Sequence, residues 1–164
     1  MPPRPLAIVD IDGVLADVRH RVHFVEQRPK DWKRFFAAAV HDKPHPEGLA
    51  VVARLAEDHD IVFLTGRPEH LRADTTEWLG RHGLDQHKLV MRPEGDRGPS
   101  SRFKVREATR LARHNKVDVV IDDDTSVIAA MHDAGFPTLH ADWETRDAQE
   151  QASLFEAQQI EGRT

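Results

Sequence analysis

The sequence predicts an α/β protein of three layers, in which a central parallel sheet of about five strands lies between helices. Short runs rich in apolar and β-branched residues are typical of strands buried on both faces of a sheet. These runs alternate with longer helical stretches, and such alternation favours parallel strands joined by right-handed crossovers. The expected strands are residues 6–9, 61–64, 88–91, 117–121 and 138–140.

Helical stretches separate these strands, and glycines mark two of the helix ends. The first crossover is delayed by residues 16–46, which contain a further expected helix at 31–40. We expect this insertion to form a small lid over the carboxyl ends of the strands, where ligands bind in parallel sheets. The expected crossover helices are residues 47–58, 68–82, 101–115 and 125–134, and the second and fourth stop at Gly83 and Gly135.

Length and composition predict one globular domain spanning residues 1–164. The 164 residues are 39% hydrophobic and 31% charged, which is typical of a chain with a packed core. From residue 144 onward the sequence is polar and rich in Gln. We expect this C-terminal tail, residues 144–164, to continue a helix that starts at 143, to end that helix at about residue 158, and then to fray.

Composition also limits the classes of site, partner and location. The chain has no Cys, which excludes disulfides, thiolate zinc sites and cysteine nucleophiles and is compatible with a cytoplasmic location. No apolar run is long enough for a membrane helix, so we expect no membrane partner. The formal charge of −5 repels nucleic acid on average, so a polynucleotide partner needs a local basic surface.

Aspartates follow two of the predicted strands. Asp10 and Asp12 come after the first strand and point the same way while the chain stays extended. Asp122, Asp123 and Asp124 follow the fourth strand. If the two strands are neighbours, these carboxylates meet at one edge of the sheet and need a cation, and hard oxygen ligands favour Mg²⁺ over zinc. Either cluster alone could instead cap a helix or end a strand.

The end of the second strand carries groups suited to anions. The hydroxyl of Thr65, the amide of Gly66 and a helix expected to start at Pro68 together form an anion pocket. The alternative is purely structural, because Thr65 could cap a helix that Pro68 begins.

Lys104 interrupts the apolar face of the expected helix 101–115. It lies in line with Ala108 and Leu111, so its ammonium group faces inward toward an anion, unless the side chain extends past the apolar stripe to water. The opposite face carries a basic stripe, which could follow a nucleic-acid backbone but is more often a solvated surface. This basic stripe consists of Arg102, Arg106, Arg110 and Arg113.

The aspartates, Thr65 and Lys104 described above resemble, in their order along the chain, the four signature motifs of the haloacid dehalogenase superfamily of phosphohydrolases. The resemblance implies a haloacid dehalogenase-like, Rossmannoid fold and a phosphatase that uses Mg²⁺. The chain departs from the pattern at Val14, where many members have a Thr that supports the nucleophile loop. The corresponding residues are Asp10-Ile11-Asp12-Gly13 for the first motif, Thr65 for the second, Lys104 for the third and Asp122-Asp123 for the fourth.

The resemblance also implies a role for each motif residue. Asp10 is the nucleophile that forms an aspartyl-phosphate, and Asp12 is the general acid and base, with its backbone carbonyl in the metal shell. Thr65 and the Gly66 amide hold the phosphoryl oxygens, while Lys104 offsets negative charge. The expected metal ligands are Asp10, Asp12, Asp122 and Asp123, and either of the last two could be the direct ligand while the other orients Lys104.

Within the superfamily, the later half of the chain resembles the 3′-phosphatase domain of bacteriophage polynucleotide kinase/phosphatase. Arg92 stands twelve residues before Lys104, which is that family's spacing, and residues 91–97, 121–125 and 131–135 are also similar. The chain departs at Ser100 and Asp124, where the family has an acidic residue and an arginine. The resemblance implies removal of 3′-phosphate from DNA or RNA ends. It also implies a separate kinase or ligase partner, because this sequence has no Gly-rich phosphate loop.

Two further groups could contact a substrate. Arg67, Arg92 and Arg97 are candidates for substrate binding because guanidinium forks fit phosphate oxygens, or alternatively they form structural salt bridges. An aromatic group in the expected lid could stack on a base or form the lid's own small core. This group is Trp32, Phe35 and Phe36.

Two histidine pairs have spacings that could bind a metal on a helix. They are His20 with His23 and His41 with His45. Prolines disrupt the second pair, and no acid or Cys completes either pair as a zinc site.

Three functions are compatible with these observations. The first is a Mg²⁺-dependent phosphatase acting on a nucleic-acid 3′ end. The second is a phosphatase of nucleoside monophosphates or other small phosphomonoesters, which the negative charge and the small lid favour. The third is a non-catalytic phosphate-binding domain on the same fold, against which the intact pair of Asp10 and Asp12 argues.

Overall fold

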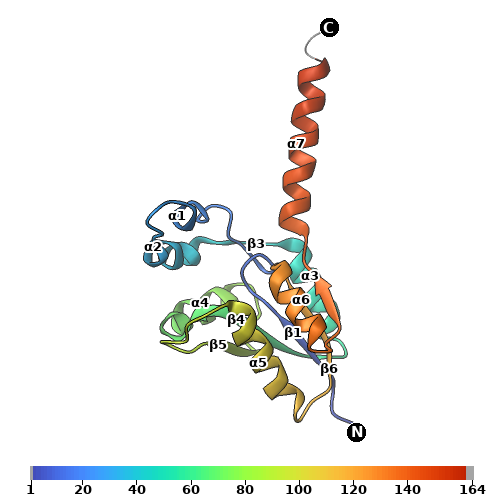
Figure 1. Ribbon diagram of the computed structural model, residues 1–164. Coiled ribbons are helices and arrows are strands. Elements are labelled where there is room, and N and C mark those ends of the chain that lie inside the picture. The colour runs from blue at the N-terminus through green and yellow to red at the C-terminus, as the bar shows by residue number, and fades with distance from the viewer. Residues whose placement is uncertain (1, 162–164) are drawn as a thin grey trace.

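The computed structural model describes residues 2–161 and contains the predicted central sheet. Its five strands run parallel in the order β5-β4-β1-β6-β7, so the first strand of the chain lies in the middle (Figure 1). This arrangement confirms the predicted α/β class. The strands are β1 (Leu6–Val9), β4 (Asp60–Pro68), β5 (Lys88–Arg92), β6 (Val117–Asp122) and β7 (Thr138–His140).

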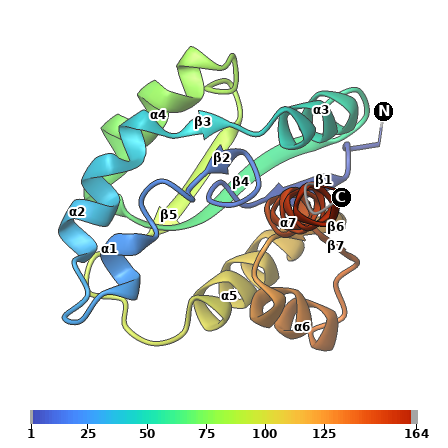
Figure 2. The ribbon, with the colours of Figure 1, turned by 90° about the horizontal axis from the view of Figure 1, so that it is seen from above.

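Helices cover both faces of the sheet, as Figure 2 shows from above. The side chains of β1 alternate between the two faces, because Ala7 and Val9 pack into one apolar cluster and Leu6 and Ile8 into the other. The three predicted layers are therefore present. The first face is covered by α3 (Pro46–Leu55) and α4 (Arg72–Arg81), and the second by α5 (Ser100–Ala112) and α6 (Thr125–Asp133).

The helix after β4 starts later than predicted. We expected it to begin at Pro68, but β4 continues to Pro68, which pairs with Arg92 of β5 beyond an irregularity in the register. The 3-10 turn η2 (Glu69–Leu71) then leads into α4. Proline is common in the first turn of a helix, but here strand pairing overrides that preference. The anion pocket expected at Thr65 therefore lacks a helix that starts at Pro68.

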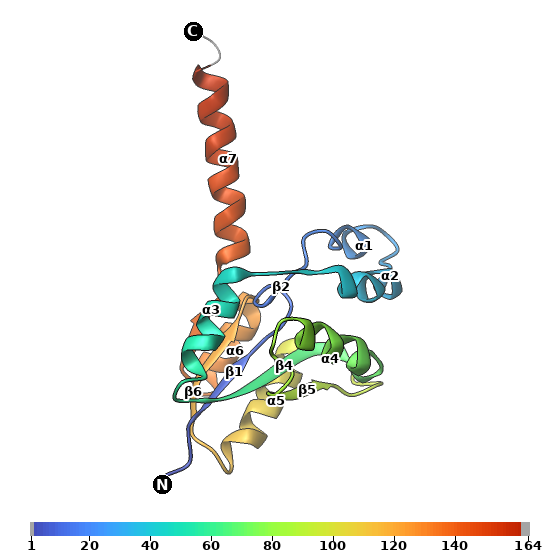
Figure 3. The ribbon, with the colours of Figure 1, turned by 180° about the vertical axis from the view of Figure 1, so that it is seen from behind.

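Residues 16–46 form the lid, and a short antiparallel strand pair joins its two ends. At the base, β2 (Ala16–Asp17) pairs with β3 (Lys43–Pro44). Beyond this pair, the helical part of the lid extends to one side of the molecule (Figure 3). We expected one helix over residues 31–40, but the helical part is divided into shorter pieces. They are α1 (His23–Glu26), α2 (Trp32–Ala37) and the 3-10 turn η1 (Ala38–His41).

A long C-terminal helix, α7 (Trp143–Glu161), projects away from the sheet (Figure 1). Trp143 anchors it, because this side chain is buried and its Nε1 donates a hydrogen bond to the carbonyl of Val14 over 3.0 Å. The helix runs past its predicted end near residue 158, and residues 162–164 of the expected tail lie outside the described residues. Within residues 2–161, every helix is too short or too polar to cross a membrane.

The loop after β1 turns tightly beneath α3. The backbone N–H groups of Val14, Leu15 and Ala16 all donate to the carbonyl of Ile11, over 3.2, 2.8 and 3.0 Å. Gly48 of α3 lies directly against this turn, because a Cβ at this position would overlap the carbonyl oxygen of Val14. Close backbone packing against α3 therefore fixes the turn that follows the central strand.

The substitution Gly48→Ala tests this contact. Alanine is the better helix former, yet we expect the variant to lose about 1–3 kcal/mol of unfolding free energy because the added methyl group displaces the turn. Urea denaturation followed by circular dichroism measures the loss. The matched control is Gly80→Ala in α4, where a Cβ would lie 3.4 Å from its nearest neighbour, and this variant should be neutral or stabilised. A stable Gly48→Ala protein would contradict the close packing.

Candidate active site

The predicted site residues lie around one cavity of about 460 Å³ at the carboxyl ends of β1, β4 and β6. This is the edge at which parallel sheets bind their ligands. Of the predicted site residues, only Arg97 is absent from the lining, and its side chain is exposed. The predicted residues that line the cavity are Asp10, Asp12, Thr65, Gly66, Arg67, Arg92, Lys104, Asp122 and Asp123.

Lys104 extends from α5 to the centre of this site. Its Nζ lies 3.0 Å from Oδ1 of Asp10 and 2.6 Å from Oδ2 of Asp122, and the side chain is buried. Burial alone would lower the pKa of Lys104, but the charges of Asp10 and Asp122 raise it above its usual value. The lysine is therefore a permanent cation beside the carboxylate that follows β1.

Three carboxylates crowd around this lysine. One carboxylate oxygen from each of Asp10, Asp122 and Asp123 lies within 4.8 Å of the others. Burial, followed by the charge of Asp122, raises the pKa of Asp10 well above its usual value. The same two causes raise the pKa of Asp123 to about 7. Three ionised carboxylates would carry more negative charge than Lys104 offsets, and their oxygen donors fit a hard divalent cation such as Mg²⁺.

Glycine is required where the first motif touches the fourth. Gly13 has a φ of +79°, which favours glycine, and a Cβ there would overlap the carboxylate of Asp123. The neighbouring Asp124 is the N-cap of α6 and accepts a hydrogen bond from the backbone N–H of Ser126 over 2.8 Å. Asp124 thus caps a helix, which was the alternative to metal binding for the aspartates that follow the fourth predicted strand.

Asp12 has surroundings opposite to those of Asp10. Its Oδ1 accepts hydrogen bonds from Nη2 of Arg67 over 2.6 Å and from Nη2 of Arg21 over 2.9 Å. Burial raises the pKa of Asp12, but the charges of Arg67 and Arg21 outweigh burial and lower the pKa to about 2. The carboxylate is therefore ionised and fixed by two guanidinium groups.

Arg21 and Asp42 are site residues that sequence analysis did not select. Both come from the lid and are buried, and Asp42 accepts from Nε and Nη2 of Arg21 over 2.8 and 2.7 Å. Asp42 also accepts from Nη2 of Arg67 over 3.2 Å and lies 2.6 Å from Nε2 of His20. The segment Arg19-His20-Arg21 is basic, but nothing in the local sequence indicates that Asp42 is the partner of Arg21.

The predicted substrate-binding arginines have different environments. Arg67 is buried and directs its guanidinium group to Asp12, Asp42 and Thr75 rather than to open space. The Nη2 of Arg92 donates to the carbonyl of Gly98 over 2.7 Å, whereas its buried Nε has no hydrogen-bond partner among the described residues. Arg92 thus lines the cavity with a donor that a ligand could satisfy.

Thr65 is buried at the cavity and its Oγ1 accepts a hydrogen bond from the backbone N–H of Arg67 over 3.1 Å. This bond leaves the hydroxyl hydrogen available to donate. Thr65 therefore contributes a donor next to Gly66, although the expected helix start at Pro68 is missing.

The basic stripe on α5 is partly neutralised by neighbouring acids. Nη2 of Arg106 lies 2.5 Å from Asp96, and Nη2 of Arg110 lies 2.7 Å from Glu107. Such exposed pairs contribute little stability, but they reduce the positive charge that a nucleic-acid backbone would meet. These contacts favour the interpretation of the basic stripe as a solvated surface rather than as a track for a nucleic-acid backbone.

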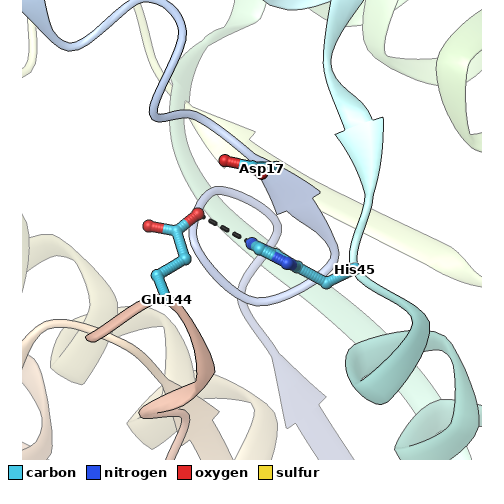
Figure 4. A group of neighbouring side chains, drawn as sticks. All are labelled: Asp17, His45 and Glu144. Carbon is cyan, nitrogen blue, oxygen red and sulfur yellow. Dashed lines mark hydrogen bonds and ion pairs between the residues drawn. The ribbon is translucent and has the colours of Figure 1, made fainter. Parts of the chain in front are cut away.

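His45 lies at the base of the lid between two carboxylates that are distant in sequence, as Figure 4 shows. Its Nε2 is 2.7 Å from Oε1 of Glu144, which also accepts from the backbone N–H of Val18 over 3.3 Å. Asp17 is held by Arg19, whose Nε and Nη2 donate over 2.9 and 2.6 Å. We expected no acid to accompany His45, and Glu144 corrects that expectation because folding brings it from α7. The cluster joins the lid base to α7.

The comparisons with known proteins agree with this geometry. The profile of the family described as "Polynucleotide kinase PNKP phosphatase domain" matches residues 4–144. A comparison with curated proteins gives no significant match.

Solved structures share the fold at low sequence identity. The "Structure of the Pnkp1/Rnl/Hen1 RNA repair complex" has a TM-score of 0.63 and 19% identity over 84% of this chain and 42% of that chain. The "Structure of Pnkp1/Rnl/Hen1 complex" has a TM-score of 0.65 and 20% identity over 84% and 46%. A "Hydrolase, haloacid dehalogenase-like family protein SP0104 from Streptococcus pneumoniae" has a TM-score of 0.60 and 9% identity over 84% of each chain.

The chain spans less than half the length of the two chains from the Pnkp1 complexes. The family profile, however, covers the sheet, the lid and all four motifs that surround the cavity. On the strength of this match, the chain belongs to the family of polynucleotide kinase PNKP phosphatase domains and has a haloacid dehalogenase-like fold.

Proposed function

We propose that this chain removes 3′-phosphate from polynucleotide ends, as a Mg²⁺-dependent phosphatase that works through an aspartyl-phosphate. The observation that carries the proposal is the contact of Lys104 with Asp10 inside a cluster of buried carboxylates. A carboxylate beside a permanent cation is suited to attack an anionic phosphate ester. The family match supports a polynucleotide as the substrate.

The acidic cluster would hold the metal ion. Asp10, Asp122 and Asp123 would supply carboxylate oxygens. The backbone carbonyl of Asp12 would supply a further oxygen. When bound, Mg²⁺ neutralises charge on the carboxylates and on the phosphate, which reduces the repulsion between nucleophile and substrate. Lys104 provides the same kind of neutralisation from the side of α5.

Two displacements then complete the reaction. A carboxylate oxygen of Asp10 bonds to phosphorus as the bond from phosphorus to the 3′ oxygen breaks, and that oxygen takes a proton from Asp12. Asp12 is ionised in the free protein, so this step requires that it binds a proton in the substrate complex, where the negative phosphate opposes the charges of Arg21 and Arg67 and raises the carboxyl pKa. A water molecule next attacks phosphorus and gives a proton to Asp12, which releases inorganic phosphate and restores the Asp10 carboxylate. The hydroxyl of Thr65 and the amide of Gly66 hold phosphoryl oxygens during both displacements.

The lid contributes to the reaction through the position of Asp12. Arg21 of the lid and Arg67 of β4 hold the Asp12 carboxylate, and Asp42 holds both arginines. We therefore infer that the orientation of the acid-base residue depends on the lid being seated. A kinase or ligase that prepares or joins the same ends is the expected partner.

The substitution Asp10→Asn tests the nucleophile. We expect phosphate release to fall to background, because an amide cannot form the aspartyl-phosphate, while the melting temperature stays close to that of the wild type. Asp133→Asn is the matched control, since Asp133 is exposed on α6. Near-normal turnover by purified Asp10→Asn protein would refute the covalent mechanism.

A panel of substrates tests the 3′-end assignment. Phosphate release with Mg²⁺ is measured from a 3′-phosphorylated oligonucleotide, its 5′-phosphorylated twin, and 3′- and 5′-mononucleotides. We expect the 3′-phosphorylated oligonucleotide to give the highest kcat/KM. Equal or better turnover of mononucleotides would reassign the chain to small phosphomonoesters, and no turnover of any substrate would favour a non-catalytic phosphate-binding domain.

The substitution Asp42→Asn tests the coupling of the lid to Asp12. We expect a loss of about 3 kcal/mol of unfolding free energy, because two buried guanidinium groups lose one of the two carboxylates that pair with them. We also expect kcat to fall by about tenfold or more as Asp12 loses its orientation. Urea denaturation and steady-state kinetics measure the two effects.

The control for this variant is Asp17→Asn, which breaks a more exposed pair with Arg19 and should change the unfolding free energy by less than about 1 kcal/mol. If Asp42→Asn retained wild-type kcat, the inferred dependence of Asp12 on the lid would be wrong.

A further inference from the structure

An exposed aromatic side chain lies on the lid at the edge of the active-site cavity. Trp32 is 50% exposed although it is a large apolar residue, and it lines the same cavity as Asp10. The other two tryptophans of the chain, Trp78 and Trp143, are buried. A half-exposed indole ring beside a phosphate site is the type of surface on which nucleic-acid bases stack.

The neighbouring rings hold Trp32 in place. The ring of Trp32 stacks on that of Phe36, with centroids 5.8 Å apart and an angle of 25°, and meets the edge of Phe35 at 5.7 Å. Phe35 in turn lies under the guanidinium group of Arg21, which is 4.3 Å from its ring centroid. Because Arg21 also binds Asp12, the aromatic group has a fixed position relative to the reacting groups.

The lid segment around Trp32 is basic in a chain that is negative as a whole. Residues 28–34 contain four cationic side chains and one acidic side chain, whereas the whole chain has a formal charge of −5. The four cations, Arg28, Lys30, Lys33 and Arg34, are all exposed.

Three of these cations, Arg28, Lys30 and Lys33, form no ion pair within the part of the chain that the structure describes. The fourth, Arg34, lies 3.5 Å from Asp31. The Nζ of Lys30 lies 5.6 Å from the ring centroid of Trp32, so charge and aromatic surface adjoin each other. This is the local basic surface that an acidic chain needs in order to hold a polynucleotide.

We propose that Lys30, Trp32 and Lys33 form a binding site for the single-stranded segment that precedes the 3′-phosphate. One base stacks on Trp32, and the lysines contact backbone phosphates of the same strand. This assignment rests on the proposed function, and it explains how a small lid selects a polynucleotide over a simple phosphate ester. Stacking is tolerant of sequence, so the site accepts any 3′ end of suitable length.

Binding is tested directly in full-length Asp10→Asn protein, which does not depend on turnover. The probe is a labelled, 3′-phosphorylated single strand of about eight nucleotides, followed by fluorescence anisotropy. In this background, adding Trp32→Ala should weaken binding about tenfold, whereas adding Trp32→Phe should largely preserve it. The matched control, Lys116→Ala, removes an exposed lysine outside the lid and should leave the affinity unchanged.

Two further readouts separate stacking from charge. The intrinsic fluorescence of Asp10→Asn protein should be quenched by the strand, because Trp32 is its exposed tryptophan, and Trp32→Phe should abolish most of the quenching. Replacing both Lys30 and Lys33 by Ala should reduce the slope of log affinity against log salt by about 1.4, as expected for two lost phosphate contacts to a single strand.

The outcomes distinguish this site from the proposed function. If the strand binds with equal affinity to the Trp32→Ala and parent proteins and causes no quenching, the lid site is refuted even when 3′-phosphate is released normally. If binding shows the expected dependence on Trp32 but wild-type protein releases no phosphate from 3′ ends, the lid site stands and the proposed function fails. A kcat/KM ratio of oligonucleotide to glycerol phosphate that falls about tenfold in Trp32→Ala would support both.

Discussion

The central constraint in this protein is the concentration of negative charge at the end of the central strand. Asp10, which follows β1, and the aspartates at the end of β6 are brought together because these strands are neighbours in the sheet, and one buried lysine faces them. Like charges in a low-dielectric interior destabilise the folded chain unless cations accompany them. The packing of Gly13 against Asp123 brings the groups still closer, since a larger residue would separate them.

Two carboxylates only two positions apart therefore have opposite environments. Burial, followed by the charge of Asp122, raises the pKa of Asp10, whereas the charges of two guanidinium groups outweigh burial at Asp12 and lower its pKa to about 2. The turn after β1 produces this separation, because it directs one side chain toward α5 and the other toward the lid. A division of this kind allows neighbouring carboxylates to have different chemical roles.

The sequence was sufficient to predict the features that depend on local patterns. The five strands, the aspartates at their ends and the inward position of Lys104 all follow from short-range periodicity, and the structure contains them. The expected start of the second crossover helix at Pro68 was wrong, because strand pairing with Arg92 is a non-local interaction that proline statistics do not include. The partnership of Arg21 with Asp42 was missed for the same reason.

The join between lid and sheet has a consequence for how the family could diversify. Because β2 pairs with β3, the chain leaves the sheet and returns to it at adjacent points. The length of the lid segment between β2 and β3 therefore has little effect on the position of the sheet strands. Doubling a loop costs only about 0.6 kcal/mol in closure entropy. The segment between Arg21 and Asp42 can therefore be exchanged for longer or differently charged sequences while these two residues keep Asp12 in place. Substrate choice can thus evolve separately from the reaction chemistry.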